Sequence, residues 1–262
     1  METALLKAIG DLLKSFDEGW ELWAGVFARM GAIAFLAPAI GELSVSPRVR
    51  LAAAAALTAV IAPGLVAPAG AGEPSTFIAI LAAEASAGLL VGFILRLAIF
   101  ILQIFGAIAA QSLSMTQLFG PGLGHDQESP LATIFISAGL ALACAAGLHI
   151  QVAAAAAQTY ALIPLGGLFN VGDAAGFVAT ESAKVISLAF GIAAPFVLLG
   201  MAYSAALAAS NRTMPQMAAV FVGAPAISLA GLTLIAGAAW AVLSRWTDIA
   251  SVLFSAPLGG LP

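Results

Sequence analysis

Six long runs of apolar residues, separated by short polar breaks, account for most of the chain. A run of about 18 or more apolar residues is long enough to cross a membrane as an α-helix. The pattern therefore predicts an all-α fold: a polytopic membrane protein with about six long apolar helices, in one membrane domain over residues 1–262. We expect the helices at residues 22–41, 50–69, 77–110, 130–163, 177–209 and 215–245.

The third, fourth and fifth runs are longer than a simple membrane crossing requires. Each exceeds 30 residues, and a helix of that length extends over about 50 Å. The apolar core of a bilayer is only about 30 Å thick. These runs must therefore tilt strongly, break into hairpins or project beyond the membrane, and Pro195 predicts a kink in the fifth.

Three polar stretches interrupt the apolar pattern. Residues 1–20 place leucine, isoleucine and phenylalanine at helical spacing, which predicts an amphipathic helix on the membrane surface or against a partner, and not a cleavable signal peptide. Residues 112–129 form the longest predicted loop. The third polar stretch begins at Asn211 and Arg212. Pro215 within it suits the first turn of a new helix, and Gly223 and Pro225 predict that this helix is irregular.

Composition supports a membrane protein and argues against other classes. The chain is 62% hydrophobic and 8% charged, with a mean hydropathy of +1.07, whereas soluble domains carry about 25% charged residues. The net charge is −4 and there is no run of basic residues, so no nucleic-acid partner is expected. The single cysteine, Cys144, lies in an apolar run and is expected to be a small core residue.

The chain lacks the short motifs of common enzymes and cofactor sites. It contains no H-E-x-x-H motif, no Walker loop and no G-x-G-x-x-G element. His125, Asp126 and Glu128 cluster in the long predicted loop and His149 lies in the next predicted helix, but their spacing matches no standard metal site and favours an ordinary solvated loop. We therefore expect neither catalytic activity nor a metal or other cofactor.

Four charged residues inside apolar runs are candidates for function: Arg29, Glu84, Glu181 and Lys184. A charge at the centre of a bilayer costs about 3 kcal/mol or more unless it is paired or reaches water. In a six-helix topology these four would lie at similar depth and form one intramembrane layer of balanced charge, facing a partner or an aqueous channel. Arg96 would lie apart from it. The alternative is that these side chains extend to the membrane interface.

Short elements rich in proline, glycine and arginine follow one another in a particular order. They are Phe27-Ala28-Arg29, Ala37-Pro38, Pro47-Arg48-Val49-Arg50-Leu51, Ile61-Ala62-Pro63, Phe119-Gly120-Pro121-Gly122, Ile163-Pro164-Leu165-Gly166, Ala194-Pro195, Asn211-Arg212, Pro215-Gln216 and Gly223-x-Pro225. Over almost the whole chain this set resembles the FliR family, flagellar biosynthetic proteins of the type III export gate. The chain departs from the family pattern at Ala107, His149 and Val220.

The resemblance implies a non-enzymatic core component of the flagellar type III protein export gate. A FliR-like chain assembles with FliP-like and FliQ-like subunits into a channel through which unfolded flagellar proteins are exported, beside FlhB-like and FlhA-like export components. It would reside in the bacterial inner membrane, within the flagellar basal body. The family fold is a set of FliP-like and then FliQ-like helical hairpins, much of it standing above the membrane plane.

The resemblance also assigns roles to two sets of residues. Apolar side chains in the central loop would close the channel by excluding water from a constriction, and flanking glycines would let the segment move; the alternative is an ordinary connecting loop. The plug residues would be Leu113, Met115, Leu118, Phe119, Gly120, Pro121 and Gly122. The motif residues expected to pack against partners are Pro47, Arg48, Arg50, Asn211, Arg212, Pro215, Gln216, Gly223 and Pro225.

Two other functions are compatible with the pattern. Virulence secretion systems use homologues of the same fold, so a virulence component is one alternative to the flagellar assignment. A small secondary transporter is the other, because charges and helix breakers inside apolar runs also suit a substrate site within the membrane. No convincing inverted repeat supports the transporter.

Overall fold

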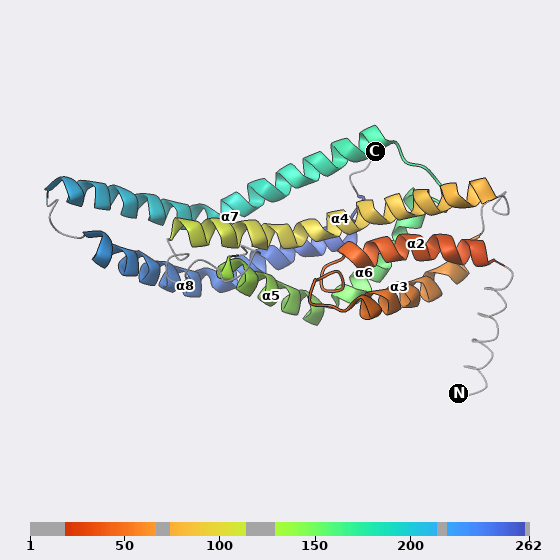
Figure 1. Cartoon of the computed structure of the whole chain (residues 1–262), viewed down its shortest axis with the longest axis horizontal. Helices are drawn as coiled ribbons and strands as arrows, with labels where there is room; N and C mark the ends of the chain where they lie inside the picture. The colour runs from red at the N-terminus through yellow and green to blue at the C-terminus, as the bar shows by residue number, and fades with distance from the viewer. Residues whose placement is uncertain (1–18, 67–73, 114–128, 214–218, 260–262) are drawn as a thin grey trace, which may run out of the picture. The chain divides into compact units, whose positions relative to one another are not determined.

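The structure, a computed structural model, describes residues 19–66, 74–113, 129–213 and 219–259 (Figure 1). Within these ranges all regular structure is helical, as predicted. The elements are α2 (Trp20–Leu36), α3 (Pro47–Ile61), the short 3-10 helix η1 (Ala62–Gly64), α4 (Pro74–Ser112), α5 (Pro130–Ala145), α6 (Leu148–Leu162), α7 (Val171–Thr213) and α8 (Ala219–Ser255). The amphipathic helix predicted for residues 1–20 lies, apart from its last two residues, outside the described ranges.

The prediction of about six long apolar helices is not confirmed. α2 and α3 contain 17 and 15 residues, short of the roughly 20 that cross a bilayer. Three helical stretches of the described chain are long and apolar enough to cross: Phe77–Ser112, Val171–Ala209 and Ala226–Ser255. α5 and α6 together would add a fourth, bent span.

A glycine divides the fourth predicted run into two helices. Gly147 has a φ of 80° and is the N-cap of α6. This left-handed conformation is open to glycine without the steric cost of a Cβ atom, and it cannot continue a right-handed helix. The run from 130 to 163 is therefore broken at this point.

The single cysteine lies outside the core. Phe135, Gly139 and Ala143 form the buried face of α5, at intervals of four residues. Cys144 follows the last of them and is therefore rotated out of this face, and it is exposed. Its predicted place in the core is wrong.

The three longest helices are α4, α7 and α8, with 39, 43 and 37 residues. A helix of 37 residues already extends over about 55 Å, well beyond the roughly 30 Å apolar core of a bilayer. Because α4 and α7 are continuous, the third and fifth predicted runs do not break into hairpins. Pro195 lies inside α7 without ending it.

The chain forms two compact units. The first comprises Met1–Arg96, Gly147–Ala179 and Val252–Pro262, and the second comprises Leu97–Ala146 and Thr180–Ser251. α4, α7 and α8 each contribute one part to each unit, whereas α2, α3 and α6 belong to the first and α5 to the second.

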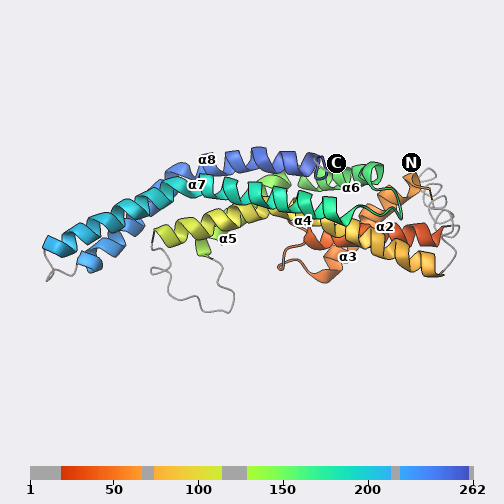
Figure 2. The same ribbon diagram turned by 90° about the horizontal axis from the view of Figure 1, so that it is seen from above.

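In the first unit, α2 lies alongside the first part of α4 (Figure 2). Gly88 and Gly92, one helical turn apart on α4, face it. A Cβ atom at Gly88 would collide with the Arg29 carbonyl oxygen, and one at Gly92 would lie 2.9 Å from the Leu36 Cβ. The absence of side chains at these two positions allows the two helices to approach closely.

In the second unit, aromatic side chains join α4 to three other helices. Phe105 packs edge-on against Phe135 of α5 and Phe196 of α7, with ring centroids 4.9 and 5.5 Å apart. Trp246 of α8 is fully buried and donates its Nε1–H to the Ala98 carbonyl oxygen at 2.7 Å. The indole thus combines apolar burial with a satisfied polar group.

Candidate functional site

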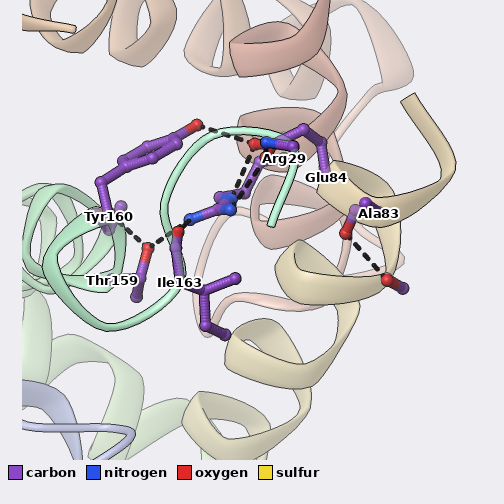
Figure 3. A network of polar contacts seen from close by, with 9 residues as sticks. Arg29, Ala83, Glu84, Thr159, Tyr160 and Ile163 are labelled. Atoms are coloured by element: carbon purple, nitrogen blue, oxygen red, sulfur yellow. Dashed lines mark hydrogen bonds and ion pairs between the residues drawn. The ribbon is translucent and has the colours of Figure 1, made fainter. Parts of the chain in front are cut away.

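A buried ion pair between α2 and α4 is the centre of the candidate site (Figure 3). Both side chains, Arg29 and Glu84, are 0% exposed. Arg29 Nη2 donates to Glu84 Oε1 at 2.9 Å, and Arg29 Nε lies 2.8 Å from Glu84 Oε2, although its N–H is not aligned for a hydrogen bond. Gly88, one turn after Glu84, brings the two helices close enough for this contact.

The Glu84 carboxylate accepts two further hydrogen bonds from a different part of the chain. The Tyr160 hydroxyl of α6 donates to Oε2 at 3.2 Å, and the Gly166 backbone N–H donates to Oε1 at 2.8 Å. Both oxygens of the buried carboxylate therefore have neutral donors as well as the guanidinium, which offsets the loss of water around the charge.

The Arg29 guanidinium contacts the same part of the chain. Its Nη1 donates to the Ile163 carbonyl oxygen at 3.0 Å and to Thr159 Oγ1 at 3.3 Å. Its Cζ atom lies 3.9 Å from the centroid of the Tyr160 ring, a cation–π contact. Arg29 and Glu84 thus hold α6 and the turn after it against α2 and α4.

The turn after α6 has the geometry that this network needs. The Gly167 N–H donates to the Pro164 carbonyl oxygen at 2.8 Å, which closes a four-residue turn. Its third residue, Gly166, has a φ of 74°, the sign that a type II turn requires there and that favours glycine. This conformation directs the Gly166 N–H to Glu84 while the Ile163 carbonyl remains available to Arg29.

The arrangement joins helices and carries no visible reactive group. The guanidinium and carboxylate neutralise each other, and apart from the Arg29 Nε–H, which only faces Glu84 Oε2, their polar groups also contact the hydroxyl, amide and carbonyl groups of α6 and its turn. A buried network whose polar groups are satisfied makes the local packing rigid and specific. The buried network can therefore fix the relative positions of α2, α4, α6 and the turn.

The structure places the other two predicted layer residues in the second unit. Lys184 Nζ lies 2.6 Å from Glu181 Oε1, three residues earlier on α7, and the Lys184 side chain is 60% exposed. Arg29 and Glu84 belong to the first unit, so neither unit contains all four charges. The single layer stays a prediction. Arg96, expected to lie apart, pairs with Glu42 at 2.6 Å.

Only one predicted plug residue is described. Leu113 is buried in the second unit, where its side chain lies against Gly231 of α8 and its carbonyl oxygen accepts a hydrogen bond from Ser228 at 3.5 Å. The other plug residues lie outside the described residues; they are Met115, Leu118, Phe119, Gly120, Pro121 and Gly122.

The predicted partner-packing residues are distributed over three helices. Pro47, Arg48 and Arg50 begin α3. Asn211 and Arg212 lie in the last turn of α7, which extends into the predicted polar break as far as Thr213, and Arg212 is exposed. Gly223 and Pro225 lie inside α8, which is described from Ala219 onward; Pro215 and Gln216, where the helix is predicted to begin, lie outside the described residues.

Sequence reasoning missed several members of the buried network. Tyr160 and Thr159 are among the few polar residues of the alanine-rich α6. Their isolation among apolar residues was the sequence signal that could have identified them as members of the network. The Ile163–Gly166 element was recognised only as part of a resemblance, and its contribution comes from backbone atoms. Glu42, the partner of Arg96, was not singled out.

Comparison with known proteins identifies the family. The profile of the bacterial export proteins, family 1, matches residues 21–252. The flagellar biosynthetic protein FliR of Caulobacter vibrioides is 31% identical over 228 residues, 85% of this chain and 90% of that protein. FliR of Escherichia coli K12 is 26% identical over 233 residues, 86% of this chain and 88% of that protein. The chain therefore belongs to family 1 of the bacterial export proteins and is a homologue of FliR.

Proposed function

We propose that this chain is a non-enzymatic core component of the flagellar type III protein export gate in the bacterial inner membrane. It forms, with FliP-like and FliQ-like subunits, the channel through which unfolded flagellar proteins pass, beside FlhB-like and FlhA-like components. The observation that carries this proposal is the similarity to two FliR proteins over 85% and 86% of the chain. Because both relatives are flagellar, the flagellar system is favoured over a virulence system.

Exposed apolar surface supports assembly with other subunits. In α7 and in α8, only 28% of the apolar 18-residue stretch that could cross a membrane is buried, whereas in α4 the buried share is 61%. Large apolar side chains are exposed along both helices, including Phe190, Leu198, Met201 and Trp240. Lipid or partner helices must cover such a surface, and we propose that the pair α7 and α8 is the FliQ-like hairpin that stacks against FliQ-like subunits.

The central loop is the proposed gate. Leu113, the first residue after α4, is held by contacts with Gly231 and Ser228 of α8, so the loop starts from a fixed point at the end of α4. Replacing Leu118 and Phe119 together by glycine should leave assembly intact and make the closed gate leak ions. Membrane conductance measures the leak. Normal assembly with no leak and unchanged export would exclude a gating role.

Co-expression tests the proposed assembly. Expressed alone, the chain should aggregate in mild detergent, because the exposed faces of α7 and α8 lack partners. Co-expression with the FliP-like and FliQ-like chains of the same organism should yield one stable complex that contains all three. A monodisperse chain that transports a small solute by itself would contradict the proposal and favour a secondary transporter.

A further inference from the structure

The turn between α2 and α3 gathers positive charge around one glutamate. Arg96 of α4 donates from Nη1 and Nη2 to the two Glu42 carboxylate oxygens, at 2.6 and 3.3 Å. Arg50 of α3 donates from Nη2 to the Glu42 backbone oxygen at 2.6 Å. Two guanidinium groups therefore converge on Glu42, but its single negative charge balances only one of them.

The excess charge has no counterpart in the described chain. Arg48, in the first turn of α3, is exposed, and within the described ranges no carboxylate lies at ion-pair distance from Arg48 or Arg50. Three arginines against one glutamate leave a net charge of +2, on a chain whose net charge is −4. The N-terminal end of α3 adds the partial positive charge of its free N–H groups. This region therefore attracts anions.

Exposed apolar residues surround the charged groups. Leu43, next to Glu42, is 94% exposed, and Phe35, Val49 and Leu51 are also exposed. Binding of a free anion does not require apolar side chains that face solvent. Basic residues beside exposed leucine and phenylalanine are typical of segments that lie in the headgroup region of a membrane.

We propose that this turn, defined by Glu42, Leu43, Arg48, Arg50 and Arg96, is a docking surface for anionic phospholipid headgroups. The arginines bind the lipid phosphates and Leu43 enters the acyl boundary. The contact between Arg96 and Glu42 holds the turn against α4. Arg96 lies near the middle of α4, so docking would set the headgroup level partway along a helix that is too long for the bilayer.

Lipid-specific quenching tests the proposal on the full chain, isolated with the subunits that accompany it. Leu43→Cys in a Cys144→Ser background carries a fluorophore at the exposed tip of the turn. The protein is reconstituted in phosphatidylcholine with a small, equal fraction of brominated phosphatidylglycerol or brominated phosphatidylcholine. We expect stronger quenching by phosphatidylglycerol. Arg48→Gln should reduce this preference about fivefold, because one basic residue contributes about that factor at an anionic surface.

Matched variants decide the outcome. Arg245→Gln removes one charge from an exposed arginine of the second unit and should leave the preference unchanged, and Arg48→Lys should retain it. Equal quenching by both lipids, no quenching by either, or no effect of Arg48→Gln would overturn the proposal. Loss of the preference on adding inorganic phosphate at constant ionic strength would instead identify a site for free phosphate.

Discussion

Replacing Glu84 by glutamine tests whether the buried network holds the first unit together. The variant keeps one carbonyl oxygen, which can accept from Tyr160 or from Gly166 in place of the two carboxylate oxygens they now use, and it leaves the Arg29 guanidinium fully buried with no carboxylate. Removing one partner of a buried ion pair costs about 3–5 kcal/mol. For a chain of this size that corresponds to a decrease of roughly 6–20 °C in the melting temperature.

A second ion pair provides the matched control. Lys184 and Glu181 lie as close as 2.6 Å, but the Lys184 side chain is 60% exposed. Exposed pairs contribute less than about 1 kcal/mol because water and salt screen them. Lys184→Ala should therefore shift the melting temperature by no more than a few degrees, although its ion pair is the shorter one.

The double variant separates charge from packing. Arg29→Met with Glu84→Gln removes both charges and keeps most of the side-chain volume, so it should be more stable than Glu84→Gln alone. The assay is thermal unfolding of the purified full-length complex, followed by intrinsic tryptophan fluorescence. If Glu84→Gln unfolds at the same temperature as Lys184→Ala, water reaches the pair in the assembled protein and the reasoning fails.

Three further predictions concern single positions. Gly88→Ala should destabilise the complex by separating α2 from α4, whereas Gly191→Ala, with open space around its Cα, should be neutral or slightly stabilising; yields of purified complex compare the two. Gly166→Ala should cost about 1–2 kcal/mol because its φ is 74°, and a thermal shift of nearly zero would count against the turn geometry. Trp246→Phe removes the hydrogen bond to Ala98 and should cost about 1 kcal/mol or more; chemical unfolding in detergent measures it.

The sequence alone determined that the chain is helical, apolar and suited to a membrane, because apolar periodicity and low charge are local properties. It also placed charges inside apolar runs, and the contact between Glu181 and Lys184 follows from their spacing of three residues on one helix. The lengths of the helices were harder to predict from the sequence. The break at Gly147 depends on a single φ angle, and without it residues 130–163 read as one helix.

The tertiary structure alone decided which residues form the buried site. The partner of Arg29 depends on the rotation of α2 and α4 about their axes and on the close approach at Gly88. The other contacts come from 76 to 134 residues away along the chain, and two of them involve backbone atoms of the turn at 163–166, which carry no sequence signature of their own. Contacts of this kind depend on how helices pack, and periodicity along one helix does not encode that packing.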